Sequence, residues 1–326
     1  MSKKILITGG TGFIGSHLSE LLVKTGYSVT VFDRYNIDNT YGWLEHSEYK
    51  SSIEFILGDI RDFDSVFKAS QNHDVIFHLA ALIGIPYSYI SPMAYIQTNI
   101  VGTYNILEAS KLLNIPQTLI TSTSETYGTA QYVPIDEEHP LVGQSPYSAS
   151  KIAADQMAIS YFKSFEMPLK IVRPFNTYGP RQSQRAVIPT IIAQLLNGKK
   201  EISLGNLSPT RDLTYVEDTC NGFHEILLSN KLFGMSTNIG MSNEISIGDL
   251  FERINTIMCT NASIKNEKNR IRPEASEVER LYCDNTKIMK YTNWQPKFEI
   301  DAGLKKTIDW MDKNRSLLKL SDSYVV

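Results

Sequence analysis

The stretch TGGTGFIG, residues 8–15, follows the short apolar run KKILI and precedes apolar residues at helical spacing over residues 14–22. Gly9, Gly12 and Gly15 satisfy the GxxGxxG spacing, and GxGxxG is satisfied when the count starts at Gly10. Glycines here permit a tight turn and close approach of the backbone to a pyrophosphate, while the helix N-terminus offers free N–H groups. The stretch predicts the strand, turn and helix that open a dinucleotide-binding fold, and a purely structural glycine turn is the alternative.

The next apolar run, YSVTVFD at 27–33, ends in Asp33, 18 residues after Gly15 and close to the spacing of about 20 expected for a ribose-binding carboxylate. Such a carboxylate accepts the ribose hydroxyls and repels a 2′-phosphate, so NAD is favoured over NADP. Arg34 lies beside it and weakens the distinction, since an arginine there can accept a phosphate.

Further strand patterns follow, and they are nearly continuous in apolar residues, as expected for a parallel sheet covered by helices on both faces. They are IEFILGD (53–59), DVIFHLA (74–80), TLITSTSE (118–125) and LKIVRPFN (169–176). A helix is predicted over 99–113, and another begins near Ser145 as the cap and Pro146 in the first turn. The predicted fold is α/β, a Rossmann doubly wound parallel sheet over 1–175 with a return segment near 213–240. Residues 176–326 are expected to form mainly a smaller α/β substrate lobe.

Composition narrows the functional classes. The 326 residues carry a formal net charge of -3, so no basic field attracts nucleic acid or membranes. Three widely spaced cysteines form no CxxC pair, no apolar run approaches the length of about 18 residues typical of a membrane span, and the apolar run at the N-terminus is too short for a signal peptide. We expect a cytoplasmic protein. His78 lies in an apolar strand and is interpreted as a core residue, and no metal-binding spacing such as HExxH is found, so no metal is expected.

Tyr147 and Lys151 form a YxxxK pair, and residues four apart share one face of a helix. A lysine ammonium near a phenol would lower the pKa of the phenol from about 10 toward neutrality, which would allow Tyr147 to take a proton from a sugar hydroxyl. The alternative is two unrelated residues on a helix surface.

The order of these motifs resembles that of the extended short-chain dehydrogenases/reductases that act on nucleotide sugars. The matching segments are TGGTGFIG, Asp33, GDIRD (58–62), HLAAL (78–82), TSTSETYG (121–128), Tyr147 with Lys151, RPFNTYGPRQ (173–182) and RDLTYVED (211–218). The resemblance implies NAD in the first lobe and a nucleoside diphosphate sugar in the second. It assigns cofactor contacts to Gly9, Gly12, Phe13, Ile14, Gly15, Asp33, Arg34, Asp59, Ile60, Leu79, Ala80, Ala81, Asn99, Tyr147 and Lys151. The predicted substrate contacts are Pro86, Tyr87, Asn176, Arg185, Val187, Arg211 and Arg272. Among the arginines, Arg211 and Arg272 are favoured, Arg280 less so, and Arg181 and Arg185 least.

Within TSTSETYG, the resemblance gives Thr123 the 4-hydroxyl of the sugar, and Glu125 bears on the reaction. Related epimerases carry a small residue at the position of Glu125, whereas dTDP-glucose 4,6-dehydratases resemble STDEVYG, in which an aspartate supplies the C6 acid and a glutamate the C5 base. Here Ser124 replaces that aspartate. UDP-glucuronate decarboxylases also resemble STSEVYG, so Glu125 alone does not exclude them. Either Ser124 relays a proton through water, or Glu125 serves C5 and C6 in turn.

The segment AALIGIPYSYISPMAYIQTN (80–99) resembles N-acetylhexosamine 4,6-dehydratases of legionaminic-type pathways, which act on GDP-N-acetylglucosamine. This favours a 4,6-dehydratase. A 4-epimerase, a UDP-glucuronate decarboxylase and a non-catalytic NAD-binding regulator remain alternatives, and Tyr87 and Tyr89 could instead be core residues. The family commonly pairs through the helices that we expect at 99–113 and 150–162, so the resemblance implies a homodimer.

Overall fold

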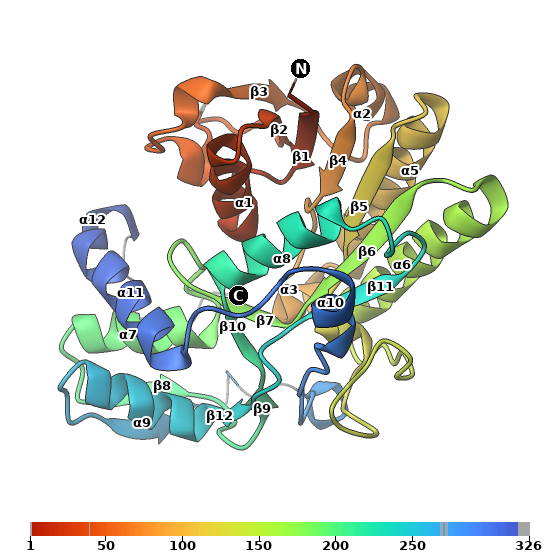
Figure 1. Cartoon of the computed structure of the whole chain (residues 1–326). Helices are drawn as coiled ribbons and strands as arrows, with labels where there is room; N and C mark the ends of the chain where they lie inside the picture. The colour runs from red at the N-terminus through yellow and green to blue at the C-terminus, as the bar shows by residue number, and fades with distance from the viewer. Residues whose placement is uncertain (1, 39, 268–269, 271–272, 319–326) are drawn as a thin grey trace.

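A seven-stranded parallel sheet forms the centre of the protein, in the order β11-β6-β5-β4-β1-β2-β3 (Figure 1). The computed structural model describes residues 2–38, 40–267, 270 and 273–318. The strands are β1 (Lys4–Thr8), β2 (Ser28–Asp33), β3 (Ile53–Leu57), β4 (Val75–His78), β5 (Gln117–Thr121), β6 (Leu169–Pro174) and β11 (Ser236–Ile239). The predicted doubly wound α/β fold is confirmed.

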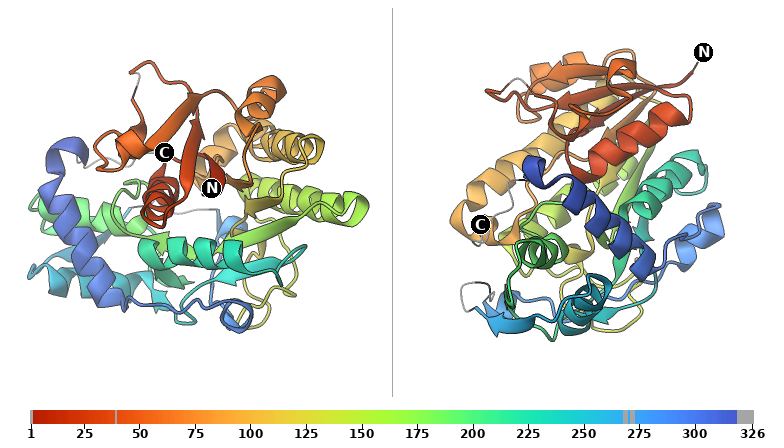
Figure 2. Two further views of the ribbon diagram at one scale, coloured as in Figure 1. Left: turned by 45° about the horizontal axis from the view of Figure 1, so that its top comes forward. Right: turned by 90° about the vertical axis from the view of Figure 1, so that its left-hand side faces the viewer.

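Helices cover both faces of this sheet (Figures 1 and 2). One face packs against α1 (Phe13–Lys24) and α8 (Val216–Leu228), and the other against α2 (Phe63–Ser70), α5 (Gly102–Leu112) and α6 (Pro146–Phe165). Both sides of the strands are therefore buried, which explains why β4 and β6 are buried along their whole length and are mostly apolar.

The start of α6 is fixed by its own sequence. The Ser145 hydroxyl accepts from the Ser148 backbone N–H at 3.1 Å, and the Ser148 hydroxyl accepts from the Ser145 N–H at 3.0 Å. Pro146 occupies the first turn. This reciprocal cap satisfies two otherwise free donors, and it sets the register of Tyr147 and Lys151 at the beginning of the helix.

Between β4 and α5 the chain forms three short helical segments: α3 (Ile85–Ile90), α4 (Pro92–Tyr95) and a π-helical turn, η3 (Ile96–Val101). The helix expected over 99–113 thus consists of the end of η3 followed by α5. Single π turns often occur at functional sites, and η3 packs against α6.

The chain after β6 builds smaller elements beside the sheet, seen in the lower part of Figure 1. They are β7 (Asn176–Tyr178), α7 (Val187–Leu196), β8 (Glu201–Leu204), β9 (Thr210–Arg211), β10 (Leu213–Tyr215), β12 (Ile245–Ser246), α9 (Ile247–Ile257), β13 (Ser263–Asn266), η6 (Glu274–Ser276), α10 (Thr286–Tyr291), α11 (Ile300–Lys313) and α12 (Arg315–Leu318). Three two-stranded pairs join β10 to β7, β12 to β9 and β13 to β8. Two elements of this region return to the large sheet: β11 joins it beside β6, and α8 packs against one face of that sheet.

Strand order decides where a ligand can bind. The chain runs from β1 outward to β3 and then crosses back to β4 on the other side of β1. At such a switch point the loops at the carboxyl ends of the strands diverge and leave a crevice. The loops after β1, β4 and β5 therefore meet at one edge of the sheet. None of the helices in the described part of the chain has the length and apolarity needed to cross a membrane.

Candidate active site

The glycine turn leaves a cradle with no room for side chains. Gly9 has φ of +71°, in the region that favours glycine, and a Cβ there would lie 2.8 Å from the Ala80 Cα. A Cβ on Gly15 would lie 2.2 Å from the Gly9 carbonyl oxygen. The Gly12 N–H donates to that same oxygen at 3.2 Å. The turn is thus as tight as a pyrophosphate-binding loop requires, and it lies at the N-terminus of α1.

Asp33 is attached to this turn. Its carboxylate accepts from the Thr11 backbone N–H at 3.0 Å and from the Arg34 N–H at 2.7 Å, and it also accepts from the Thr11 hydroxyl. The side chain is half-buried at the end of β2, and Arg34 beside it is exposed. Phe13 and Ile14 form the first turn of α1. A half-exposed carboxylate fixed beside the glycine turn fits a ribose diol.

Asp59 and Ile60, two of the cofactor contacts that the resemblance implies, follow β3. The Asp59 carboxylate is paired with the Arg61 guanidinium at 2.5 Å, and this hydrogen-bonded arginine lowers the pKa of Asp59. Ile60 is buried, and its carbonyl accepts from the Asn105 side chain at 2.9 Å. Ile60 also contacts Gly102 at the start of α5 so closely that a Cβ on that glycine would clash.

The loop after β4 is held from two sides. The Leu79 and Ala80 N–H groups donate to the Thr8 carbonyl and hydroxyl at 3.1 and 3.2 Å. Asn99 of η3 holds Leu82 by two bonds of 2.9 Å and also donates to the Ser150 hydroxyl of α6 at 2.9 Å. The Asn99 amide is therefore used to place the loop that contains Ala81, and to connect this loop to the helix that carries Lys151.

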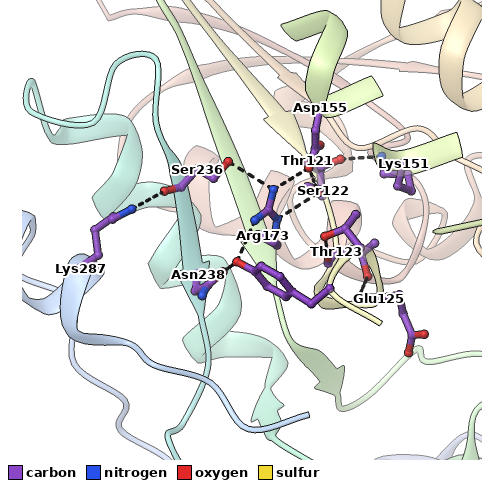
Figure 3. A network of polar contacts seen from close by, with 12 residues as sticks. Thr121, Ser122, Thr123, Glu125, Lys151, Asp155, Arg173, Ser236, Asn238 and Lys287 are labelled. Atoms are coloured by element: carbon purple, nitrogen blue, oxygen red, sulfur yellow. Dashed lines mark hydrogen bonds and ion pairs between the residues drawn. The ribbon is translucent and has the colours of Figure 1, made fainter. Parts of the chain in front are cut away.

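The turn after β5 presents the predicted acid–base residues (Figure 3). Thr123 caps the short 3₁₀ helix η4 (Ser124–Thr126), and its hydroxyl accepts from the Glu125 N–H at 3.3 Å. Ser124 is buried, and Glu125 is 8% exposed. In Figure 3 the Glu125 carboxylate points away from the polar contacts around Arg173. No residue in the described part of the chain forms a hydrogen bond or ion pair with this carboxylate. The Glu125 carboxylate is thus largely shielded from solvent and is available to contact a ligand.

Tyr147 and Lys151 both lie beside this turn, but their electrostatics differ from expectation. Burial raises the pKa of Tyr147 well above its ordinary value; a side-chain hydrogen bond with Thr123 opposes this rise, and the Glu125 charge adds to it. The Lys151 ammonium donates to the Thr121 carbonyl at 2.6 Å, and burial lowers its pKa. The predicted lowering of the Tyr147 pKa by Lys151 is therefore not found, because desolvation of the phenol dominates and the ammonium is engaged elsewhere.

An aromatic group that the sequence did not reveal packs on Tyr147. The ring of Tyr95 meets that of Tyr147 edge to face at 6.2 Å, and its hydroxyl donates to the Gly84 carbonyl. Tyr87 lies 6.2 Å from Tyr95 on the other side. The one available signal was the position of Tyr95, one helical turn before Asn99. Tyr87 and Tyr89 are 41% and 38% exposed, so the alternative that they are core residues is wrong.

The side chains predicted for the substrate lie on several separate elements. Pro86 lies in the first turn of α3, and Val187 begins α7. The buried Asn176 side-chain oxygen at the start of β7 has no hydrogen-bond partner among the described residues. Arg272 lies outside the described residues.

Arg185 is exposed and lies near the tyrosines. Burial raises the pKa of Tyr95 to about 12, and the positive charge of Arg185 opposes this rise. Arg185 and Tyr87 thus both act on Tyr95, the ring that packs against Tyr147.

The other arginines are paired. The Arg211 guanidinium is buried and lies 3.2 Å from the Glu277 carboxylate. Arg181 is paired with Glu20 of α1 at 2.9 Å, and Arg280 with Glu244. Arg181 therefore ties the segment after β7 to the first helix, a structural contact that agrees with its place among the weaker substrate candidates.

His78 is a satisfied core residue, as predicted. Its two ring nitrogens lie 2.8 Å from the Thr8 hydroxyl and 3.1 Å from the Thr103 hydroxyl, and burial lowers its pKa to about 3. Within residues 2–38, 40–267, 270 and 273–318, no group of three or more His, Cys, Asp or Glu side chains is arranged to hold a metal ion.

Comparison with known proteins agrees with this geometry. A family model described as GDP-mannose 4,6 dehydratase matches residues 6–307. A UDP-N-acetyl-alpha-D-glucosaminuronate decarboxylase of Bacillus cytotoxicus is 33% identical over 95% of this chain and 98% of its own.

Two solved structures are similar throughout. The dTDP-glucose 4,6-dehydratase of Streptomyces venezuelae, solved with NAD, has a TM-score of 0.88 at 26% identity and covers 96% of this chain and 98% of its own. A UDP-glucuronic acid 4-epimerase of Bacillus cereus, solved as a variant with NAD and a UDP-sugar, has a TM-score of 0.88 at 30% identity, covering 95% and 99%. The similar proteins thus share a fold and differ in the reaction that they catalyse.

Proposed function

The chain belongs to the family described as GDP-mannose 4,6 dehydratase, and on that premise we propose that it is an NAD-dependent nucleotide-sugar 4,6-dehydratase. The observation that carries the proposal is Glu125, a sheltered carboxylate without a partner among the described residues, on the turn that also presents Thr123 to Tyr147. An epimerase returns hydride to C4 and needs no base at C5. A carboxylate kept free beside the C4 acid–base pair is what elimination across C5 and C6 requires.

The glycine cradle, the Asp33 carboxylate and the loop after β4 are the groups that would hold NAD, in agreement with the NAD bound to the two solved relatives. The cofactor supplies a hydride acceptor that serves later as the donor. Tyr147 takes the proton of the 4-hydroxyl, and Thr123 orients that hydroxyl by hydrogen bonding. Burial raises the pKa of Tyr147, and the hydrogen bond with Thr123 opposes this rise, so Thr123 helps the phenol to serve as the base. Lys151 is proposed as the lysine of the pair on the YxxxK resemblance.

Once C4 is a ketone, the proton on C5 becomes acidic and Glu125 removes it. The C6 hydroxyl then leaves as water, which requires a proton. We assign that proton to Glu125 itself, which then carries the proton that it took from C5. The enone left by elimination must still gain a hydride at C6, which the reduced cofactor would supply, and a proton from solvent at C5, and these two additions give the 4-keto-6-deoxy sugar. Ser124 is buried within η4 and has no ionisable group, and its part would be limited to relaying a proton through water.

For the substrate we propose GDP- or UDP-N-acetylglucosamine, which would place the enzyme in a legionaminic-type pathway. The resemblance of segments 80–99 and 122–137 to N-acetylhexosamine dehydratases supports this choice. Asn176, with its unpaired buried oxygen, and Arg185, exposed beside the tyrosines, support a site for the sugar diphosphate next to Tyr87. Arg211 and Arg272 are proposed as further diphosphate ligands.

We further propose a cytoplasmic homodimer that pairs through α5 and α6, with residues 1–175 and the return segment binding the cofactor and the remainder binding the nucleotide sugar. Exposed apolar side chains on these two helices support the pairing surface: Tyr104 and Leu112 on α5 and Phe165 on α6 are 42%, 54% and 53% exposed.

The direct test is mass spectrometry of GDP- and UDP-N-acetylglucosamine and of UDP-glucuronate after incubation with the enzyme in deuterated water. A dehydratase gives a product that has lost one water and carries deuterium at C5. An unchanged mass with inverted configuration at C4 would replace the proposal with a 4-epimerase, and loss of carbon dioxide would replace it with a decarboxylase.

A second test addresses Glu125 alone. The Glu125→Gln variant is expected to oxidise C4 and to stall before elimination, so the reduced cofactor accumulates without loss of water. Glu138→Gln, at an exposed position in the next loop, is the matched control and should behave as wild type. Full turnover by Glu125→Gln would remove the residue from the mechanism.

A further inference from the structure

Two side chains of α6, one helical turn apart, hold two consecutive residues at the end of β5. The Lys151 ammonium donates to the Thr121 carbonyl at 2.6 Å, and the Ser122 hydroxyl donates to the Asp155 carboxylate at 2.6 Å. The next residue is Thr123, where the catalytic turn begins. One face of α6 thus fixes the end of the strand from which Thr123 and Glu125 project (Figure 3).

Arg173 of β6 completes the arrangement beneath the turn. Its guanidinium forms an ion pair of 2.7 Å with Asp155, and the two side chains are only 2% and 0% exposed. The same guanidinium donates to the Tyr127 hydroxyl at 2.7 Å and lies over the Tyr127 ring. Because Tyr127 follows η4 directly, Arg173 is connected to the chain on both sides of the catalytic turn.

The network extends to the neighbouring strand. The Tyr127 hydroxyl donates to the Asn238 side chain at 2.7 Å, and Arg173 also donates to the Ser236 hydroxyl at 3.3 Å. The ion pair is thus linked by side chains to β5, α6 and β11 at once. Figure 3 shows these contacts converging on Arg173.

We propose that Asp155 and Arg173 are positioning residues for the reaction: their buried ion pair sets the placement of the catalytic turn and of Lys151 relative to Tyr147. The proposal rests on the proposed function for its chemistry, but not for its geometry. The side-chain hydrogen bonds of the pair join Asp155 and Arg173 to each other and to Ser122, Tyr127 and Ser236. The pair therefore acts on the turn through Ser122 and Tyr127, and on Lys151 through the Asp155 charge.

A purely stabilising role does not account for the pair. Replacing a buried ion pair by well-packed apolar residues often leaves stability unchanged or improves it, because both charges lose their hydration. An apolar pair could not form hydrogen bonds with the Ser122 hydroxyl and the Tyr127 phenol. It therefore could not hold these groups and α6 in one fixed geometry.

The charge of Asp155 also acts on Lys151. Burial lowers the pKa of Lys151, and the Asp155 carboxylate opposes this effect. Other titratable groups facing this region are His78 on β4, which burial and the Lys151 charge keep neutral, and Tyr147 on α6 and Tyr127 after η4, whose pKa values burial raises. The charges of Glu125 and Glu137 act on Tyr147 and Tyr127, respectively. The Oδ1 oxygen of Asp155 is buried and has no hydrogen-bond partner among the described residues. Arg173 contacts only the other carboxylate oxygen, Oδ2.

The test compares three perturbations of the pair with a control, using the nucleotide sugar that the wild-type enzyme converts. Asp155→Asn removes the charge, Asp155→Leu with Arg173→Met removes the pair without leaving a buried arginine, and Ser122→Ala removes one contact alone. Glu20→Gln breaks the partly buried pair with Arg181 and controls for the general loss of an ion pair. The measurements are kcat and KM as functions of pH, and amide hydrogen exchange over residues 121–127.

We expect Asp155→Asn and the double variant to lose activity at an alkaline limit about one pH unit lower than wild type, because Lys151 loses its proton earlier. We expect kcat at neutral pH to fall about 100-fold with little change in KM, and exchange over 121–127 to accelerate. Ser122→Ala should show a smaller fall in kcat, with no shift of the alkaline limit. Glu20→Gln should change neither quantity.

A folded Asp155 variant that keeps the wild-type alkaline limit and kcat would overturn the proposal, and so would unchanged exchange over 121–127 in all three variants. The exchange measurement needs no substrate. If wild type converts no nucleotide sugar, the proposed function fails, while the exchange results still decide whether the pair positions the turn.

Discussion

Replacing Gly15 by alanine tests the cofactor cradle with a single methyl group. The added Cβ would lie 2.2 Å from the Gly9 carbonyl oxygen and 2.8 Å from the Gly10 Cα, whereas ordinary contacts begin at 3.4 Å. Both neighbours are backbone atoms, so α1 and the turn must separate by about 1 Å. Overpacking of this kind typically costs about 1–3 kcal/mol of stability, and we expect NAD affinity to fall at least about tenfold, or about 1.4 kcal/mol.

The assay is calorimetric titration of the purified protein with NAD, together with urea unfolding. Gly26→Ala is the matched control: Gly26 has φ of +91°, and a Cβ added there would have no heavy atom within 4 Å, so alanine costs about 1–2 kcal/mol through backbone strain alone. That variant should lose stability and keep its affinity. If Gly15→Ala binds NAD as tightly as Gly26→Ala, the turn is a structural feature and not the cofactor cradle.

Three further outcomes are expected. Tyr147→Phe should lower kcat, measured by steady-state kinetics, by a factor of about 100 to 10,000, since the phenol is the proposed proton acceptor. Burial lowers the pKa of Lys170 to about 8; the unfolded chain therefore binds more protons between pH about 8 and about 10, and urea unfolding should show stability rising with pH across that window relative to Lys170→Gln. A parallel decline of both proteins would contradict this. Tyr104→Glu, which puts a charge on the exposed face of α5, should yield monomers in light scattering, and an unchanged mass would place the dimer surface elsewhere.

Much of the fold could be predicted from the sequence because its signals are local. Gly9, Gly12 and Gly15 are set by one turn, and the reciprocal cap at Ser145 is set by four residues. Strands buried on both faces read as apolar runs whatever their neighbours are, which is why the parallel sheet was recognised.

Three features of the candidate site could not be predicted, because each depends on how separate elements pack together. Arg173 stands inside a mostly apolar strand, and its partner Asp155 lies 18 residues earlier, on the preceding helix; nothing near either residue indicates the other. Tyr95 meets Tyr147 only because the chain after β4 folds into α3 and α4. The pKa of Tyr147 was predicted in the wrong direction because the spacing of YxxxK shows the lysine but not the burial of the phenol.

The position of β11 has a consequence for synthesis. This strand is the last to join the sheet, and it pairs with β6, which precedes it by the whole segment from β7 to α8. While the chain leaves the ribosome, β6 is made early and stays an open edge until β11 emerges, and an open edge is prone to pair with other chains. Since Arg173 also donates to Ser236 on β11, the polar network beneath the catalytic turn is complete only after that late step. We therefore expect a nascent chain that stops before residue 236 to aggregate more readily than the finished protein.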